Sequence, residues 1–571
     1  MIREEAEAAG RIEFRGAGNG VRVYSGHPVV LVAGRDRLQC TVAASDEPVQ
    51  VLVEVPLGDA AAFWRPSAGY DLRLPPDWGG RADVSGILRA PLGVLHDQDG
   101  LASAGFAVEP ANSAVALRYG VSEESAAFVV QFGFEPADHE RRVVIDLTGG
   151  ELFDTVARLR QEVQTIAPHR VAALADEPVY STWYSFHDAL DAESILQEAR
   201  LAKELGFGCL FLDYGWQRLG DSRYFDGCGD WVADEAKFPD LAATVREIQS
   251  LGLGVVLWVA PLLLGDRSDA FATLGEGATQ RNPNLRAHIL DPRRPEVREH
   301  VIRAFTRLVD ELGVDGLKID FIDAASVYAA PGDVAAHGEI AAAATRMLDD
   351  LRQATDAAGY RDLIFEYREP YVGLGLAASG DVIRAEDCPG DFIANRRATI
   401  DLRVFDTGQR VHSDMMMWDP ELSAPMVAVA LSNATFSVPQ ISMRLTSMTP
   451  QARDHIAAWL TAWRQVRDVA LRGRLVGLRP QLHYPSATAV RGDASLSVVW
   501  SSDSIVSVPP DARRAVIVNG TTSTRLSVRL DAAAHVQVVD HLGADIATGE
   551  LAIGTSELQV PVGGRAHLSV G

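Results

Sequence analysis

The sequence is short of cysteine. Only four cysteines, Cys40, Cys209, Cys228 and Cys388, occur in 571 residues, and none lies near another along the chain. This pattern fits neither a disulfide framework nor a zinc site. We therefore expect reduced thiols in a cytoplasmic protein, with a bridge between Cys228 and Cys388 as the alternative.

Long apolar runs are also missing. No stretch approaches the roughly 20 apolar residues of a membrane-spanning helix. The longest run, from Val255 to Leu264, is interrupted by Pro261 and is typical of a buried strand. The amino terminus, MIREEAEAAGRIEF, has acidic residues where a secretory signal begins with basic ones, so no export signal is expected.

Basic residues are outnumbered. The chain has 53 Lys and Arg against 77 Asp and Glu, a formal charge of −24. Such a surface repels phosphate backbones and anionic lipid, which argues against nucleic acid and membranes as partners. A neutral or cationic small molecule is the expected ligand.

The hydrophobic periodicity divides the chain into three domains. Residues 1–150 contain short β-rich runs separated by Gly, Pro and Asp, which predict a β-sandwich, and residues 151–177 predict a helical linker. Residues 178–471 repeat strand, loop and helix eight times, as a closed (β/α)₈ barrel requires, with the first strand expected at 182–186. Strand patterns return in residues 472–571 and predict a second, antiparallel β domain.

Two helix ends are predicted within the barrel. An apolar stripe from Val297 to Leu312 is followed by Gly313, which suits a left-handed C-terminal cap. Thr449 before Pro450 is the expected start of the last helix.

Carboxylates close several of the predicted barrel strands. In a barrel of this kind the reacting groups project from the carboxyl ends of the strands. These ends hold Asp213, Asp320 and Glu366, and the sixth strand runs into Arg384, Glu386 and Asp387. Any single Asp here has the alternative of capping the next helix.

Two of these carboxylates fit a two-carboxylate mechanism. Lys318 and Asp320 alternate onto one face of a strand, and the ammonium is expected to keep Asp320 ionised, as a nucleophile must be. Asp387 lies between Glu386 and Asp391, where like charges favour a retained proton. The pattern predicts Asp320 as nucleophile and Asp387 as general acid and base, as in retaining glycoside hydrolysis.

Aromatic residues cluster along the same strand ends. Flat rings with an N–H or O–H donor suit the face of a pyranose. Each is individually more typical of packing, but together they favour a sugar pocket: Trp183, Tyr184, Tyr214, Trp216, Trp231, Trp258 and Trp418.

Several of these motifs resemble a known family. The run from WYSFHDALDAESIL to CLFLDYGWQ, then GDWVADEAKFPD and LDPRRPEVREHVIRAFTRLVDELGVDGLKIDF, is similar in order and spacing to the catalytic barrel of glycoside hydrolase family 36, the α-galactosidase type of the melibiase clan, over about residues 178–420. The resemblance implies an amino-terminal supersandwich, a central barrel, a small carboxy-terminal β domain, no metal or other cofactor, and an exo-acting retaining α-glycosidase. It also implies possible oligomers.

The family's motifs fall on particular residues here. Its KxD motif implies that Lys318 binds substrate and that Asp320 is the nucleophile, and its acid/base motif implies Asp387, with Arg384 close by. Its DDGW motif falls on residues 213–216 and its GDW motif on residues 229–231, which implies sugar contacts from Asp213, Tyr214, Trp216, Asp230 and Trp231.

The sequence also departs from the family. The second aspartate of DDGW holds galactose hydroxyls in α-galactosidases, and here it is Tyr214; a Cys and Gly-rich motif after strand five is replaced by residues 366–371, EYREPY. Because unpaired buried polar groups reject a wrong sugar, the glycone can differ from galactose. Arg368 either pairs with Glu366 or grips an acidic sugar.

Other readings stay open. His412 and Asp414 are expected at the same rim, in hydrogen bonds to sugar hydroxyls, with a metal site that joins His412, His187 and Asp213 as the alternative. Among functions, a transglycosidase of the raffinose-synthase type, a non-catalytic carbohydrate-binding barrel and a metal-dependent barrel enzyme compete with the glycosidase.

Overall fold

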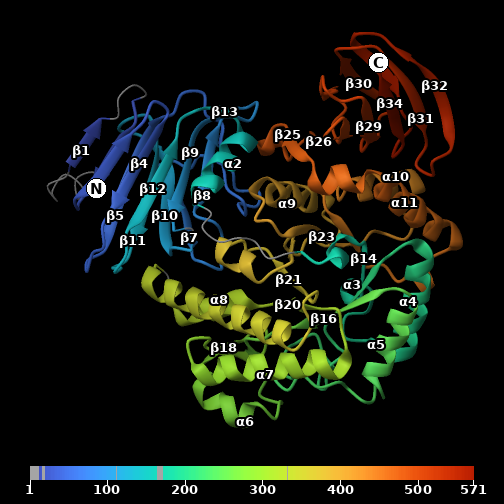
Figure 1. The fold of residues 1–571 in the computed structure, drawn as a ribbon, viewed down its shortest axis with the longest axis horizontal. Coiled ribbons are helices and arrows are strands. Elements are labelled where there is room, and N and C mark those ends of the chain that lie inside the picture. Colours follow the sequence, from blue (N-terminus) through green and yellow to red (C-terminus); the bar gives the residue numbers. More distant parts are fainter. Residues whose placement is uncertain (1–11, 16–19, 111, 164–170, 331) are drawn as a thin grey trace.

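Two antiparallel sheets form the amino-terminal part of the computed structural model, which describes residues 12–15, 20–110, 112–163, 171–330 and 332–571 (Figure 1). One sheet has the order β1 (Ile12–Arg15), β2 (Arg22–Ser25), β5 (Val49–Pro56), β11 (Ala127–Phe134), β10 (Val115–Ser122) and β7 (Gly80–Val84). The other has β3 (Val29–Ala33), β4 (Arg37–Val42), β12 (Arg141–Asp146), β9 (Leu101–Glu109), β8 (Leu92–His96) and β6 (Ala62–Trp64), with β13 (Gly150–Glu151) paired to β9. Alternating residues such as Val53, Phe128 and Val143 fill the space between the sheets.

A closed barrel of eight parallel strands follows. The strands are β14 (Val179–Ser181), β15 (Cys209–Leu212), β16 (Gly254–Val259), β20 (Gly316–Ile319), β21 (Ile364–Arg368), β22 (Val382–Arg384), β23 (Arg410–Met416) and β24 (Val438–Ile441), and β24 pairs with β14 to close the ring. The strands are buried on both sides because helices surround them, which explains their continuous apolar runs.

Helices cover the outside of the barrel. The longer ones are α4 (Ala192–Leu205), α5 (Leu241–Ser250), α7 (Pro295–Leu312), α8 (Val334–Ala357), α9 (Phe392–Phe405), α10 (Ala424–Ser432) and α11 (Pro450–Arg472). Shorter elements lie in the loops: α3 (Trp183–Phe186), α6 (Phe271–Leu274), and a small sheet of β17 (Leu263–Leu264), β19 (Ala287–Ile289) and β18 (Gln280–Asn282).

The carboxy-terminal part is again built from sheets (red in Figure 1). Its larger sheet has the order β25 (Arg474–Gly477), β26 (Ser486–Arg491), β27 (Ala494–Val499), β29 (Arg514–Asn519), β34 (Arg565–Val570), β31 (Ala534–Val539) and β32 (Asp545–Leu551). The smaller sheet has β28 (Ile505–Ser507), β30 (Arg525–Leu530) and β33 (Gly554–Gln559). The predicted fold class of sandwich, barrel and β domain is confirmed, although β27 pairs with β29, and β28 with β30, in parallel.

The first barrel strand lies earlier than predicted. Residues 182–186 were expected to be a strand, but β14 ends at Ser181 and α3 begins at Trp183. The hydroxyl of Ser442 accepts the backbone N–H groups of Tyr184 and Ser185, at 3.0 and 3.1 Å, and so stabilises the start of this short helix. Both predicted helix ends are confirmed: Gly313 caps α7 with φ of 65°, and Thr449 accepts the N–H of Ala452.

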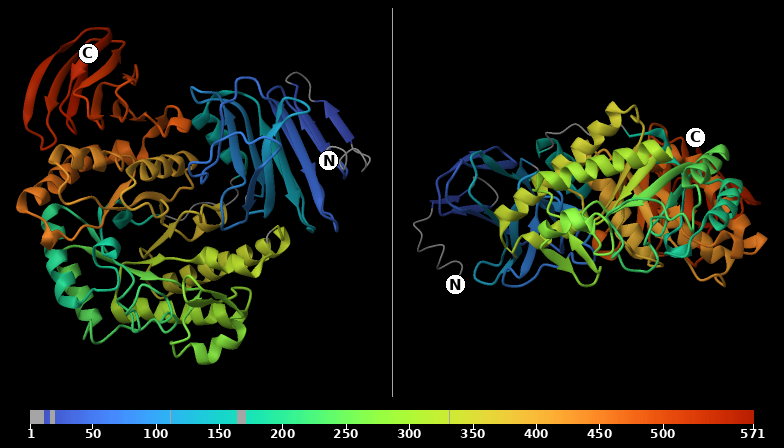
Figure 2. Two further views of the ribbon diagram at one scale, coloured as in Figure 1. Left: turned by 180° about the vertical axis from the view of Figure 1, so that it is seen from behind. Right: turned by 90° about the horizontal axis from the view of Figure 1, so that it is seen from below.

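Helix α2 (Leu152–Val163) connects the amino-terminal sheets to the barrel, within the stretch predicted as a helical linker. Its buried residues, among them Val156 and Leu159, join the barrel core, and Leu159 packs directly over Gly105 of β9. The two further views show this helix between the amino-terminal sheets and the carboxy-terminal part (Figure 2). Within the described ranges, no helix combines the length and apolarity needed to cross a membrane.

One buried carboxylate joins the three parts of the chain. Asp401 of α9 accepts hydrogen bonds from the indole of Trp64 in β6, at 2.7 Å, and from the hydroxyl of Tyr484, at 2.5 Å. Burial raises the pKa of Asp401 to about 6, against the positive charge of Arg397. The indole of Trp64 also lies 3.2 Å from the hydroxyl oxygen of Tyr484, so the three side chains form one buried hydrogen-bonded group around Asp401.

Replacing Asp401 with Ala is expected to lower the melting temperature clearly. The buried hydroxyl of Tyr484 loses its acceptor, at a cost of about 1–3 kcal/mol, and the indole of Trp64 keeps only its longer bond to Tyr484. Asp401→Asn keeps one oxygen acceptor and should lose less, and differential scanning calorimetry of both variants measures the difference. Equal melting temperatures for Asp401→Ala and the unchanged protein would contradict this role.

Candidate active site

Asp320 follows the last residue of β20 and points into the barrel mouth, with its side chain 12% exposed. Oδ1 accepts hydrogen bonds from Nε of Arg368, at 2.7 Å, and from the backbone N–H of Phe321, at 2.8 Å. Oδ2 accepts the indole N–H of Trp258, at 3.2 Å. The carboxylate is thus held from three sides in one orientation.

The positive charges around Asp320 keep it ionised. Burial alone would raise the pKa of this carboxyl, but Arg368 and Lys318 outweigh burial and hold the pKa well below its ordinary value. The predicted ionised state agrees with this geometry. Lys318 contributes as predicted, but the larger contribution comes from Arg368, which makes the direct contact and was not predicted to do so.

Lys318 is paired with another carboxylate. Its Nζ lies 2.6 Å from Oδ2 of Asp213, the residue that follows β15, and both side chains are buried. Oδ1 of Asp213 accepts the backbone N–H of Tyr214. Lys318 and Asp213 therefore form one buried ion pair beside Asp320.

Asp387 lies on the loop after β22 and is more exposed to solvent than Asp320, with its side chain 52% exposed. Its Oδ1 is 2.9 Å from Nη1 of Arg384. The sequence predicted like-charge crowding from Glu386 and Asp391, but the charged contact is this guanidinium. Asp391 instead caps α9 by accepting the N–H of Ala394.

Arg384 connects Asp387 with two buried carboxylates. Nη1 also lies 2.5 Å from Oδ1 of Asp414, and Nε lies 3.5 Å from Oε1 of Glu366. Oδ2 of Asp414 accepts the backbone N–H of Cys388, at 2.7 Å. Asp414 thus holds the loop that carries Asp387 in two ways, by its bond to the backbone of Cys388 and by its ion pair with Arg384.

Glu366 and His412 lie deeper in the barrel than predicted. Nε2 of His412 is 2.8 Å from the carbonyl of Ala175, a residue packed among the first residues of the barrel strands. Burial lowers the pKa of His412 to about 4 and raises that of Glu366 to about 7, and Gln440 bonds to both. The rim position predicted for His412 is wrong.

The pairing of Arg368 with Glu366 was one of two alternatives, and the structure shows neither. Arg368 binds Asp320 and lies 3.8 Å from Asp323, whereas Glu366 faces Arg384. The positive charge of Arg368 is therefore already balanced by carboxylates of the site. A free basic clamp for an acidic sugar is therefore not present at Arg368.

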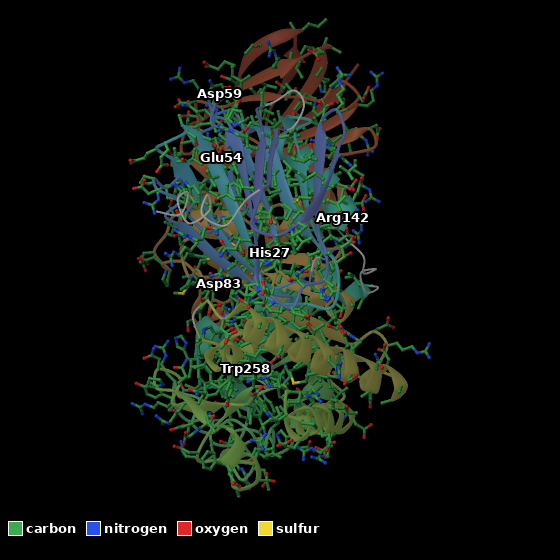
Figure 3. All side chains as sticks on the ribbon, turned by 90° about the vertical axis from the view of Figure 1, so that its left-hand side faces the viewer. His27, Glu54, Asp59, Asp83, Arg142 and Trp258 are labelled. Atoms are coloured by element: carbon green, nitrogen blue, oxygen red, sulfur yellow. The ribbon has the colours of Figure 1, made fainter. Side chains whose placement is uncertain are left out.

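Three of the predicted aromatic residues surround the Asp320 side of the site. Trp258 contacts Asp320 and packs edge to face with Tyr214, whose ring also meets that of Trp183. The phenol of Tyr214 donates to the carbonyl of Tyr224, at 2.6 Å. Seen from the side of the amino-terminal sheets, which carry Glu54, Trp258 lies within the barrel (Figure 3).

The contacts of three other predicted residues favour a structural role. Trp216 is fully buried and donates its indole N–H to the carbonyl of Trp258. Trp231 is 3% exposed and packs between Phe305 of α7 and Trp258, so it supports Trp258 from behind. Asp230 binds Arg218 and caps the segment before α6, so its oxygens are occupied.

Replacing Tyr214 with Phe is expected to leave the catalytic constants nearly unchanged, within about twofold on each sugar tested. The hydroxyl gives its one proton to a backbone carbonyl, and Tyr214 is 1% exposed, so we expect no contact between this hydroxyl and a ligand. Loss of this bond should cost about 1 kcal/mol of stability. Steady-state kinetics and thermal unfolding of the variant measure both, and a change in sugar preference would show that the hydroxyl contacts substrate.

Sequence reasoning missed three residues at this site. The hydroxyl of Tyr371 lies 3.4 Å from Oδ1 of Asp320 and 2.9 Å from Asp323. Phe225 stacks on Trp258, and Phe321 packs against Phe225. The EYREPY stretch after strand five was the only signal for Tyr371, whereas loop phenylalanines have no distinctive pattern.

The cysteine, histidine and acidic side chains are the candidate metal ligands of this chain. All four cysteines are free thiols. In the part of the chain that the structure describes, no group of three His, Cys, Asp or Glu side chains is arranged to hold a metal ion.

Comparison with known proteins supports the resemblance. A family model described as Melibiase matches residues 159–348. The chain is 28% identical over 151 residues to an alpha-galactosidase of Escherichia coli, covering 25% of this chain and 21% of that protein, and 28% identical over 130 residues to alpha-galactosidase AgaA of Geobacillus stearothermophilus, covering 22% and 16%. The matched region thus spans about a fifth of these relatives.

The fold comparison covers more of the chain. A GH36 alpha-galactosidase AgaA variant from Geobacillus stearothermophilus, solved in complex with raffinose, superposes with a TM-score of 0.64 at 15% identity, over 98% of this chain and 83% of that chain. At this identity the superposition establishes the fold. The family model over residues 159–348 and this shared fold agree with the resemblance to glycoside hydrolase family 36, the α-galactosidase type of the melibiase clan.

Proposed function

We propose that the chain is a retaining, exo-acting α-glycosidase that hydrolyses terminal α-linked sugars by double displacement. The observation that carries the proposal is a pair of carboxylates in contrasting surroundings. Asp320 is buried and ionised by Arg368 and Lys318, whereas Asp387 lies half exposed on a loop fixed by Arg384. The surroundings of Asp320 are those that a nucleophile needs, and the exposed position of Asp387 suits a group that exchanges protons with a leaving group and then with water.

In the first step a carboxylate oxygen of Asp320 attacks the anomeric carbon. Oδ2 is the better placed oxygen, because its described partner is one indole N–H, whereas Oδ1 carries Arg368 and a backbone N–H. The bond to the leaving oxygen breaks as Asp387 gives it a proton. The product is a glycosyl ester on Asp320 with inverted configuration.

In the second step water replaces the ester. Asp387, now a carboxylate, takes a proton from the water as the water oxygen attacks the anomeric carbon from the vacated face. The bond to Asp320 breaks, and Arg368 and Trp258 receive the returning carboxylate charge. The two inversions give net retention.

The substrate class is proposed as an α-galactoside or a close variant of it. Two matched relatives are alpha-galactosidases, and the solved neighbour binds raffinose. The site differs from the family pattern at Tyr214, which removes one acceptor and supplies none in return. Asp213 remains as an acceptor, positioned by Lys318.

Aryl α-glycosides that differ at carbons two, four and six of the sugar test this proposal. Hydrolysis followed by proton NMR should first release the α-anomer of the preferred sugar. A β-anomer as the first product would exclude double displacement. No turnover on any glycoside, with sugar binding intact by calorimetry, would favour the non-catalytic barrel.

Replacing Arg368 with Gln is expected to shift the acidic limb of the pH profile upward. Without this guanidinium the largest charge that opposes burial is lost, so the pKa of Asp320 rises. The nucleophile is then protonated at a higher pH than in the unchanged protein, so kcat/KM falls first on the acidic side. Kinetics from pH 3 to 8 measure the limb.

Arg200→Gln is the control for Arg368. Arg200 pairs with Glu247 on the outer surface of α4 and α5, and both are about half exposed. This variant should keep the original profile. An unmoved limb in Arg368→Gln would show that Arg368 does not set the ionisation of Asp320.

A further inference from the structure

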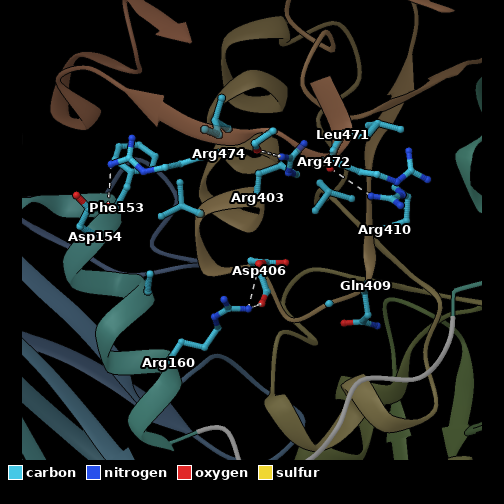
Figure 4. Close-up of a pocket in the computed structure, with 16 residues that line it drawn as sticks. Phe153, Asp154, Arg160, Arg403, Asp406, Gln409, Arg410, Leu471, Arg472 and Arg474 are labelled. Carbon is cyan, nitrogen blue, oxygen red and sulfur yellow. Dashed lines mark hydrogen bonds and ion pairs between the residues drawn. The ribbon is translucent and has the colours of Figure 1, made fainter. Parts of the chain in front are cut away.

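A cavity lined by arginines lies away from the barrel mouth, where α2, the segment after α9 and the link from α11 to β25 come together. It has a volume of about 350 Å³ and is lined by Arg160, Arg403, Arg410, Arg472 and Arg474, with Asp154 and Asp406 as its acidic residues. We call it the arginine cavity. Figure 4 shows four of these arginines along one side, with Arg160 and Asp406 opposite.

Two of the five arginines are matched by acidic residues of the cavity itself. Arg474 lies 2.8 Å from Asp154, and Arg160 lies 3.0 Å from Asp406. These pairs join α2 to the carboxy-terminal part and to the barrel. They account for both acidic residues of the lining.

The remaining three guanidinium groups, those of Arg403, Arg410 and Arg472, carry more positive charge than the nearby carboxylates balance. Arg410 and Arg472 share one carboxylate, that of Asp176. Asp468 lies 3.6 Å from Arg472 but is closer, at 2.9 Å, to Arg491. The group thus has an excess of positive charge at a protein surface that is acidic overall.

Arg403 has only carbonyl partners among the described residues. It donates to the backbone oxygens of Ala470 and Gly473, at the end of α11, and of Phe436, before β24. Burial, aided by Arg410 and Arg472 and opposed by Asp406, lowers its pKa to about 10. The charge is therefore desolvated and repelled by two neighbours of the same sign, a cost that a bound anion would offset.

An unpartnered donor belongs to a lining residue of the same cavity. Nε of Arg160 is buried without an acceptor in the described structure. Nε2 of Gln409 also has no acceptor there, but it lies beside Gly380 and is not counted toward the cavity. Buried donors normally find an acceptor, so the free donor of Arg160 beside excess positive charge points to an anionic ligand.

We propose that the arginine cavity binds a small phosphate-bearing anion, either inorganic phosphate or a phosphate monoester. A dianion supplies the missing charge, and its tetrahedral oxygens match the planar donor fork of guanidinium groups. The volume is in the range of small-molecule sites, about 300–1,000 Å³. The ligand would join α2, the barrel and the start of β25, and so would stabilise the arrangement of the three parts.

Isothermal titration with inorganic phosphate and with glucose 6-phosphate, at constant ionic strength set by sodium chloride, tests the proposal. Saturable binding of either probe is expected, with a rise in melting temperature that grows with ligand concentration. Tighter binding of glucose 6-phosphate identifies the monoester as the ligand class, and equal or weaker binding identifies inorganic phosphate.

Arginine substitutions inside and outside the cavity distinguish binding at this site from a general effect of protein charge. The double variant Arg410→Gln, Arg472→Gln should weaken binding at least tenfold, and Arg472→Gln alone, at a partly exposed position, should weaken it less. Arg514→Gln, which removes an exposed arginine of β29, is the matched control and should bind as the unchanged protein does. Absence of saturable binding, or equal binding by the double variant, would overturn the proposal.

Discussion

Replacing Asp320 with Gly is expected to reduce kcat/KM by at least about 10⁴-fold, the largest loss from any single substitution in this chain. The variant has no carboxylate to form the glycosyl ester, and loss of a nucleophile has an effect of this order or larger in other covalent enzymes. Arg368 and Trp258 would then face an empty space. Kinetics with an aryl α-glycoside measure the loss.

Azide gives this prediction a chemical signature. A small anion in the space left by Asp320, beside Arg368, should restore turnover and give a glycosyl azide of β configuration. Asp323→Ala is the comparison, because Asp323 lies 3.8 Å from Arg368 but does not reach the reacting carbon in the proposed mechanism. It should lose less than about 100-fold and gain nothing from azide, and azide rescue there instead would contradict the role of Asp320.

Replacing Asp387 with Ala is expected to produce a loss that depends on the leaving group. A positioned general acid contributes about 10²–10⁴-fold, and only poor leaving groups need its proton. Natural glycosides should therefore lose about 10³-fold or more, whereas a dinitrophenyl glycoside should lose less than tenfold in the first step. Pre-steady-state kinetics with both substrates measure the difference.

Asp391→Ala is the matched control on the same loop. Asp391 caps α9 and accepts the hydroxyl of Tyr70, so its loss should cost about 1 kcal/mol of stability. Its effect on turnover should be the same for good and poor leaving groups. If Asp387→Ala lost the same factor in turnover with good and with poor leaving groups, as this control should, Asp387 would not be the general acid.

Much of the fold could be predicted from periodicity. The stripe from Val297 to Leu312, ended by Gly313, predicted α7, and the short β-rich runs of residues 1–150 predicted sheets that include β3 and β5. The first barrel strand was misplaced because residues 182–186 have an aromatic, strand-like composition. Their helical turn depends on a hydroxyl from Ser442, about 260 residues away, which local sequence does not report.

The sequence predicted which strands carry the site residues, but not how deep in the barrel each residue lies. Two residues on one strand, His412 and Asp414, face the same way, yet they differ by about 6–7 Å along the strand. That spacing places His412 near Ala175, at the amino-terminal end, and leaves Asp414 at Arg384. Sequence alone gives the face of a strand but not the level of each residue in the barrel.

Ion pairing was the least predictable feature. Arg368 and Asp320 are 48 residues apart, and several carboxylates compete for each cation at the barrel mouth. Strand register and side-chain conformation decide that Arg368 takes Asp320 while Arg384 takes Glu366, Asp387 and Asp414. Aromatic residues such as Trp216 and Trp231 were similarly ambiguous, because the same rings serve a sugar site and a core.

Covalent trapping tests the central proposal most directly. The protein would be incubated with a fluorinated α-glycosyl fluoride of its preferred sugar, digested, and examined by peptide mass spectrometry. We expect one added glycosyl unit on the peptide that contains Asp320, at that residue, together with loss of activity. A label on another carboxylate, or inactivation without any covalent label, would contradict the assignment of Asp320 as the nucleophile.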